Sequence, residues 1–200
     1  DPKFYAQPQY WVSKEEVNHK THVGLSWQIG IREITNTTLK RTTIVSPLPL
    51  VAFGNKVPLI RMPDLSPVLR LCWVALASSF ALDFASRQKL GALTYNQFYL
   101  KQLPFPKPEY FLQPCLWNKK YQYAQWYAAR VLELCYTTGD LTCMATDVGF
   151  NKTPFSWDIS RRSKIRKELD AACFIAYGIS PEDANYILCN TFPLFRRFNE

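Results

Sequence analysis

The sequence contains few of the residues on which nucleotide-dependent and metal-dependent chemistry relies. Glycine accounts for only 7 of 200 residues, and neither G-x-G-x-x-G nor a P-loop occurs, which excludes the glycine-rich loops that cradle phosphates. His19 and His22 are the only histidines; because no third ligand accompanies them, we interpret them as part of a surface loop. Pro63-Asp64 lacks the Glu-x-Lys partner of a metal-dependent nuclease, and no G-x-S-x-G elbow is present. We therefore expect that this chain performs no catalysis alone and binds no cofactor.

Long hydrophobic runs are also missing. The longest nearly apolar stretch, residues 71–82, has 12 residues, whereas a membrane span needs about 20. The first residues lack an initiator methionine and a secretory leader, so we expect a cytoplasmic protein and a piece of a longer chain. The six cysteines include no C-x-x-C pair, which favours reduced thiols over a zinc site, with disulfides as the alternative.

Acidic residues are scarce in one part of the chain. The whole sequence has 24 Lys and Arg against 16 Asp and Glu, a formal net charge of +8. Between Lys20 and Lys107 there are 11 basic residues but only three acidic ones, Glu33, Asp64 and Asp83, so this segment alone accounts for the excess. A localised basic excess is typical of proteins that bind a polyanion. The alternative is a solvated face that keeps the protein soluble.

The distribution of apolar residues predicts an α+β fold in two parts. Residues 1–65 have the short alternating runs of strands and turns, including a strand over 23–31 and a β-branched strand at 42–45 that stops before Ser46. Ser66-Pro67 then predicts the start of one long helix that reaches Lys89. Three prolines within residues 104–108 mark the boundary between a β-rich subdomain, 1–108, and a helical C-terminal subdomain, 109–200.

The second part is expected to be helical from Cys115 onward. Apolar stripes predict helices over 123–134, 141–148 and 161–177. Gly149 and Gly178 are placed to end two of them, and Ser180-Pro181 caps a final helix.

Several motifs in order resemble the C-terminal target-recognition region of type IIG restriction–modification enzymes and of the related BREX and DISARM DNA adenine methyltransferases. Residues 76–91, with Asp83 and Arg87-Gln88-Lys89, are similar to that family's Leu-Asn-Ser-Phe…Asp-aromatic…Arg-Gln-Lys, and residues 93–104 are similar to its Leu-Asn-aromatic and Lys-Gln-Leu-Pro. In chain order, the further matches are Arg32-Glu33-Ile34, residues 38–42, Gly54-Asn55-Lys56, Trp157-Asp158, Glu168-Leu169-Asp170-Ala171, Tyr177-Gly178-Ile179 and Thr191-Phe192-Pro193. Ser78 stands where the family usually has Asn, and Leu39-Lys40 where it has Asn-Glu.

The resemblance implies double-stranded DNA as the partner. It also implies a catalytic methyltransferase domain of the parent chain, N-terminal to this segment, which would hold S-adenosylmethionine. A methyltransferase flips its target base, and a separate module must grip the flanking duplex. The candidate residues for phosphate or groove contact are Arg32, Lys40, Arg41, Lys56, Arg87, Lys89 and Lys101. The candidates for contact with base edges are Gln88, Tyr95, Asn96 and Gln97.

Each of these assignments has a structural alternative. Arg87 is four residues after Asp83, the spacing of an ion pair on a helix surface, and Tyr95 could be a core aromatic. A second basic cluster, Arg161, Arg162, Lys164, Arg166 and Lys167, is interpreted as a solvated or interdomain face.

The predicted function is non-catalytic recognition of a DNA target within a restriction–modification or phage-defence methyltransferase. The alternative is a protein-interaction or scaffold domain that positions the catalytic domain or a defence partner. Charge reversal at Arg41 together with Lys89 is predicted to weaken duplex binding.

Overall fold

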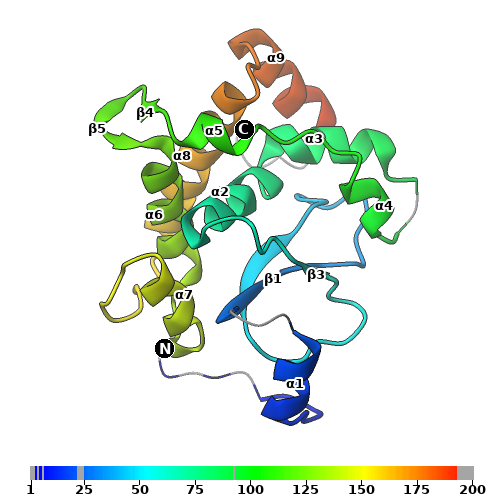
Figure 1. Cartoon of the computed structure of the whole chain (residues 1–200). Coiled ribbons are helices and arrows are strands. Elements are labelled where there is room, and N and C mark those ends of the chain that lie inside the picture. Colours follow the sequence, from blue (N-terminus) through cyan, green and yellow to red (C-terminus); the bar gives the residue numbers. More distant parts are fainter. Residues whose placement is uncertain (1–2, 4, 6, 22–24, 92, 193–200) are drawn as a thin grey trace.

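The computed structural model describes residues 3, 5, 7–21, 25–91 and 93–192 of the chain. His22, Val23, Gly24 and Pro193 of the predictions above lie outside them. Within the described residues, helices pack against small antiparallel sheets (Figure 1). This mixed architecture is compatible with the predicted α+β class.

A three-stranded antiparallel sheet forms the β part, in the order β2-β1-β3. Its strands are β1 (Trp27–Ile31), β2 (Val45–Pro49) and β3 (Leu59–Ile60). All five residues of the central β1 are buried. The strand predicted at 42–45 instead begins at Val45 and continues through Pro47 and Pro49. The prolines are tolerated because β2 is an edge strand, whose outward N–H groups have no ladder partner to lose.

The predicted long helix is two helices, α2 (Pro67–Ala77) and α3 (Phe80–Lys89), bent by 61° at the break between them. Ser79 is responsible for the break. Its hydroxyl donates to the carbonyl of Leu76 at 2.7 Å and accepts the N–H of Leu82 at 3.2 Å. One serine side chain thus ends α2 and caps α3, and this local hydrogen bonding overrides an apolar periodicity that runs through both helices.

The helices predicted in the second part are present, with bounds close to those expected. They are α6 (Tyr123–Cys135), α7 (Thr142–Asp147, preceded by the 3₁₀ turn Gly139–Leu141), α8 (Ile159–Ala176) and α9 (Pro181–Tyr186, followed by the π turn Ile187–Thr191). Gly149 and Gly178 follow α7 and α8 with φ of 82° and 66°, the left-handed conformation that glycine adopts without steric cost. Ser180 caps α9 by accepting the N–H of Asp183.

Two elements contradict the sequence prediction. Residues 14–20, expected to be strand or turn, form the helix α1 (Lys14–Lys20), whose first turn is capped by Ser13. The stretch after Pro114, expected to be helical from Cys115, contains a hairpin of β4 (Pro114–Cys115) and β5 (Asn118–Gln122). Its two-residue turn lacks the Asn-Gly or Asp-Gly that identifies hairpins from sequence.

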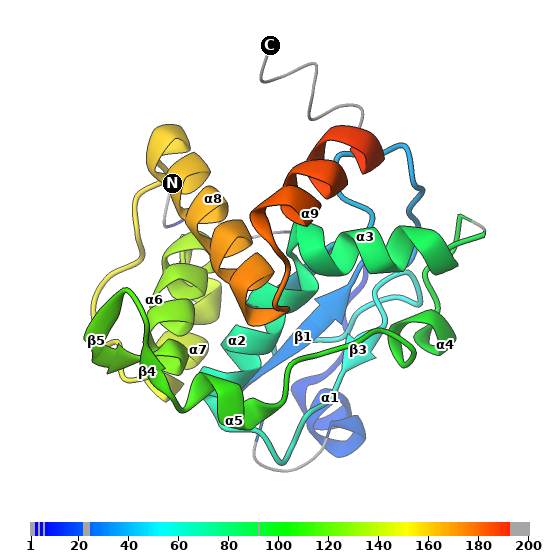
Figure 2. The same ribbon diagram turned by 90° about the horizontal axis from the view of Figure 1, so that it is seen from above.

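One hydrophobic core crosses the boundary predicted at residue 108. It contains Trp27 and Ile29 of β1, Leu71 of α2, Tyr127 of α6 and Ile165 of α8, each at most 2% exposed. Helix α2 lies between the sheet and α6, and α8 packs across both α6 and α3 (Figure 2). The chain between the two parts packs as well, because Phe105 stacks on Trp73 with ring centroids 5.1 Å apart. The two sequence segments therefore fold around a common interior.

The six cysteines are unpaired, as predicted, and Cys72, Cys115 and Cys173 are buried. Burial raises the pKa of the Cys72 and Cys173 thiols, which keeps them protonated and behaving as small apolar side chains. Within the described residues, no single helix is both long enough and apolar enough to cross a membrane; α2 and α3 pass that test only when taken together.

Candidate functional site

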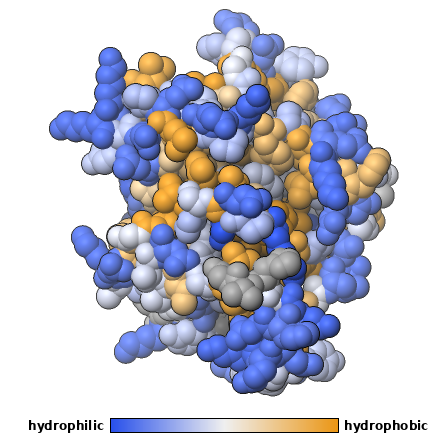
Figure 3. Space-filling model, in the orientation of Figure 1, coloured by the Kyte–Doolittle hydropathy of each residue, from blue (hydrophilic) through white to orange (hydrophobic). Residues whose placement is uncertain are grey.

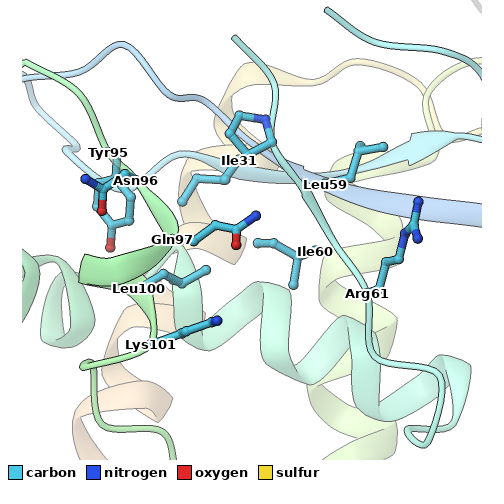
Figure 4. Close-up of a pocket in the computed structure, with 10 residues that line it drawn as sticks. Ile31, Leu59, Ile60, Arg61, Tyr95, Asn96, Gln97, Leu100 and Lys101 are labelled. Carbon is cyan, nitrogen blue, oxygen red and sulfur yellow. The ribbon is translucent and has the colours of Figure 1, made fainter. Parts of the chain in front are cut away.

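A pocket of about 260 Å³ lies between the sheet edge and the short helix α4 (Gln97–Leu100). Its residues are Ile31 from the end of β1, residues 58–61 from β3 and its flanks, residues 95–97, Leu100 and Lys101. Figure 4 shows the Gln97 and Lys101 side chains extending from α4 toward β3. None of the ten lining residues is acidic. The pocket thus combines an apolar floor with amide and cationic groups.

The segment before α4 is held on the sheet by backbone hydrogen bonds. Tyr95 N–H donates to the carbonyl of Glu33 at 2.7 Å, and Thr35 N–H donates to that of Leu93 at 3.0 Å. These bonds extend the sheet by an isolated bridge between Ile34 and Thr94. They fix the position of α4 relative to β1, and so they set the width of the pocket.

Asn96 begins α4 and faces the pocket at the same time. Its side-chain oxygen accepts the N–H groups of Phe98 and Tyr99, at 3.0 and 3.3 Å. This cap occupies the amide oxygen and so fixes which way the amide is turned. The exposed Asn96 therefore presents its NH₂ group to an incoming ligand, and this group can only donate hydrogen bonds.

Two exposed cations, Arg61 and Lys101, belong to the lining of the pocket. Arg61 donates to the backbone carbonyl of Lys20 at 3.1 Å, which leaves its positive charge uncompensated. Lys89 and Lys56 are not among the lining residues. Lys89 lies beside Gln102, with Nζ to Oε1 at 3.3 Å. Lys56 has a carboxylate nearby, that of Glu33 at 3.1 Å. The net result is a positive potential around a partly apolar hollow.

Three other predicted contact residues lie on the surface outside the pocket. Arg32 follows β1 directly, Lys40 lies in the loop between β1 and β2, and Gln88 lies on α3; all three are exposed. The structure thus brings Asn96, Gln97 and Lys101 together and leaves these three beyond the pocket.

Tyr95 is a core aromatic, which corrects its assignment as a contact to a base edge. The side chain is only 1% exposed. Its hydroxyl accepts hydrogen bonds from Ser86 at 3.1 Å and Thr43 at 3.4 Å, and burial raises its pKa. Tyr95 supports the inner wall of the pocket and has no free polar atom for a ligand.

Arg87 is an internal residue, which corrects its assignment as a phosphate contact. Its guanidinium lies 3.1 Å from the carboxylate of Asp83, with side-chain exposures of 5% and 0%. It also donates to the carbonyls of Thr37 and Leu39. The helical ion pair that was the alternative interpretation is therefore present, and it is buried.

Arg41 is likewise used inside the fold. Its guanidinium makes bidentate hydrogen bonds to the carboxylate of Asp170, at 3.1 and 2.6 Å, and donates to the carbonyl of Ser78 at 3.0 Å. Its guanidinium lies 3.3 Å from the ring centroid of Phe80. Arg41 and Arg87 together pin the loop between β1 and β2 onto α3 and α8, so neither charge is free for DNA.

The second basic cluster contains two arginines that have partners within the fold and three residues that are exposed. Arg161 pairs with Glu133 at 2.6 Å, and Arg162 donates to the carbonyl of Leu134 and lies over the ring of Trp157. Lys164, Arg166 and Lys167 are exposed on α8.

Sequence reasoning missed two residues at this site. Arg61 is one of the 11 basic residues between Lys20 and Lys107, and nothing in the sequence separates it from the others; in the structure it directly follows the edge strand β3. Phe98 of α4 is 68% exposed next to Asn96, but a lone aromatic in a short apolar run gives no sign that it faces solvent.

Comparison with known proteins gives no further assignment: no family model, no curated protein and no solved structure matches this chain. Within the part of the chain that the structure describes, no group of three or more His, Cys, Asp or Glu is arranged to hold a metal ion.

Proposed function

We propose that this chain is a non-catalytic module that binds double-stranded DNA and recognises a target sequence for a cytoplasmic DNA methyltransferase. One observation carries the proposal: the pocket between β3 and α4 joins two cations to two amides and has no carboxylate in its lining. Cations near the pocket would contact phosphates, which supply affinity, and amides would contact base edges, which supply specificity. The motif resemblance supports the same class of protein.

The pocket has the residue types that direct readout needs. The NH₂ group of Asn96 matches hydrogen-bond acceptors, such as N7 of purines or O6 of guanine in the major groove. Gln97 has both a donor and an acceptor, as the bidentate reading of adenine requires. Phe98, exposed beside them, offers an apolar surface for a thymine methyl group. Catalysis and S-adenosylmethionine are assigned to the catalytic domain of the parent chain.

Charge reversal at the pocket is expected to weaken duplex binding. Arg61→Glu with Lys101→Glu replaces two cations that would lie near phosphates by two anions, so we expect the affinity for a short duplex at low salt to fall by at least about tenfold. The measurement is fluorescence anisotropy of a labelled duplex, titrated at several salt concentrations.

The matched control is Lys164→Glu with Lys167→Glu on α8, which changes the net charge of the protein by the same amount on another element. The control should bind as wild type does, or nearly so. No duplex binding by the wild-type chain at low salt, or an equal loss in both variants, would contradict the proposal.

A second prediction concerns specificity and uses Asn96→Ser. Serine caps a helix about as well as asparagine but lacks the amide donors, so α4 should keep its stability while one base preference is lost. Selection of bound duplexes from a random pool is expected to show relaxed preference at one position. If the variant selects the same sequence as wild type, Asn96 does not contribute to base recognition.

The alternative function, a protein-interaction or scaffold domain, is favoured by one observation. Tyr10 and Trp11 are each 80% exposed and Val12 is 49% exposed, so an apolar strip precedes α1. Exposed apolar strips are typical of sites that bind another protein surface. A chain that fails to bind DNA at low salt and binds the catalytic domain through this strip would favour the alternative.

A further inference from the structure

The pocket between β3 and α4 is a hollow, and this shape limits what can fill it. Its volume of about 260 Å³ is slightly below that of pockets for drug-sized ligands, which begin at about 300 Å³. Proteins read paired bases with elements that project into a groove, such as a helix or a β-ribbon. A base that stays paired therefore keeps its edge outside the pocket, and only a small group that projects from the ligand can enter.

The segment that contains α4 has an inner face toward β3 and an outer face. Gln97, Leu100 and Lys101 are three and four residues apart, the spacing of neighbours on one side of a helix, and all three line the pocket. Phe98 does not line it, and its side chain is 68% exposed. In Figure 3 hydrophobic and hydrophilic side chains lie side by side around α4. The inner face is the one that a ligand in the pocket would contact.

The polar groups of the inner face are not used by the fold. The side chains of Gln97 and Lys101 make no hydrogen bond and no ion pair with any described residue. In the view of Figure 4 the Gln97 amide lies between the side chains of Ile31 and Ile60. A few polar groups placed in a mostly apolar pocket are what fixes the orientation of a ligand.

The rest of the lining is aliphatic or cationic. Ile31, Ile60 and Leu100 supply apolar surface from both sides of the pocket, and apolar side chains of this kind pack against the faces of an unstacked base. Arg61 directly follows β3 and Lys101 directly follows α4, so each side also contributes a cation. The matching ligand combines a planar ring that has a polar edge with a negatively charged group.

We infer that the pocket holds the base of a single nucleotide, unstacked from its neighbours, with the phosphate at Lys101 and Arg61. The amide of Gln97 donates to and accepts from the polar edge of this base, and Ile60 and Leu100 flank its ring. A free mononucleotide and an unstacked nucleotide of DNA carry the same groups, so both are possible sources. The choice of a nucleotide rests on the proposed function, and it makes an unpaired base the group that Gln97 reads.

The first test is the binding of free mononucleotides to the whole chain, measured by NMR titration. The ligands are the four deoxynucleoside monophosphates and deoxyribose phosphate, which has the charge but no base. We expect the preferred nucleotide to bind at least about tenfold more tightly than deoxyribose phosphate, because a base in the pocket adds apolar burial to the phosphate contact. Equal affinities would show attraction of anions alone and would overturn the inference.

Two variants separate the base from the phosphate. Gln97→Leu keeps a good helix former but removes the amide, so it should weaken binding of the preferred nucleotide by about three- to tenfold and leave deoxyribose phosphate unaffected. Lys101→Gln should weaken both ligands. The matched control is Gln113→Leu, the same change at an exposed glutamine outside the pocket, which should bind as wild type does. An equal loss in Gln97→Leu and Gln113→Leu would contradict the role of Gln97.

A second measurement distinguishes the two sources of the nucleotide. It compares a duplex that contains one bulged 2-aminopurine with the same duplex in which the 2-aminopurine is paired. Tighter binding of the bulged duplex would identify an unstacked nucleotide of DNA as the ligand. Binding of a mononucleotide without any preference for the bulge would identify the free nucleotide.

The outcomes also separate this inference from the proposed function. If wild type binds paired duplex and the Arg61/Lys101 variant is weakened, the absence of both a base-dependent affinity and a preference for the bulge overturns the nucleotide pocket alone. If a mononucleotide binds but no duplex does at low salt, the proposed function fails and the pocket is a site for a free nucleotide.

Discussion

Replacing Asp83 by alanine is expected to lower the free energy of unfolding by about 3–5 kcal/mol, the range observed when one partner of a buried ion pair is removed. Asp83 is fully buried. Its carboxylate accepts the N–H of Thr42 at 2.9 Å, the N–H of Thr43 at 2.6 Å and the guanidinium of Arg87 at 3.1 Å. The substitution leaves two buried N–H groups and one cation without their acceptor, and each such group has a desolvation cost.

The measurement is urea denaturation followed by circular dichroism, with Asp64→Ala as the control. Asp64 is exposed, so its loss should change stability by no more than about 0.5 kcal/mol. The double variant Asp83→Ala with Arg87→Met removes the stranded cation but not the stranded N–H groups, so we expect it to recover only part of the loss. Full recovery would show that the ion pair alone, and not the backbone contacts, stabilises the loop.

The second large effect is expected at Arg41. Arg41→Met should destabilise the protein by about 2–3 kcal/mol, less than the loss of a partner in a fully buried pair, because the side chains of Arg41 and Asp170 remain 22% and 14% exposed. In this variant, Asp170 still accepts a hydrogen bond from the N–H of Phe80, at 2.9 Å, but it loses both hydrogen bonds from the guanidinium. The stacking of Arg41 on Phe80 is lost as well.

Thermal and urea unfolding would measure this loss, with Lys89→Met as the matched control. Lys89 is exposed and its described contact is a single long hydrogen bond to Gln102, so the control should unfold as wild type does. Equal stability of the two variants would contradict the internal role of Arg41.

This expectation changes how a DNA-binding experiment must be designed. Charge reversal at Arg41 with Lys89 would weaken binding by disrupting the loop between β1 and β2, whatever that loop contacts. Charge reversal at Arg61 and Lys101 is the more informative test of DNA binding, because both residues are exposed at the pocket and neither belongs to a buried ion pair. Charge reversal at Lys89 alone also remains a usable test of DNA binding.

Elements encoded by neighbouring residues were predicted well. The stripe of α6, the glycines after α7 and α8, and the Ser180 cap of α9 all depend on residues within a few positions of each other. The break at Ser79 is also local, yet it was missed, because a serine inside an apolar stripe fits either a solvated helix position or a cap. Which of the two applies is decided by tertiary packing.

The functional assignments were harder because they depend on distant partners. Arg41 and Arg87 resemble Arg32 and Lys101 in sequence, as basic residues in a basic segment. What separates them is Asp170, 129 residues from Arg41, and the carbonyls of Thr37 and Leu39, 50 and 48 residues from Arg87. A motif that contains a buried Arg–Asp pair and a motif that contacts DNA look the same in a single sequence.

The common core of the two sequence segments constrains how this protein can exchange segments with a related chain. All ten residues of the pocket precede residue 108, so a recombination event that exchanged residues 1–108 with a related chain would transfer the whole pocket. The incoming segment would also need two things from the receiving chain. These are an acidic residue at position 170 to pair with the incoming Arg41, and a face on α6 that packs against the incoming α2. A change in what the pocket binds should therefore arise more readily by substitution around α4 and β3 than by exchange of residues 1–108.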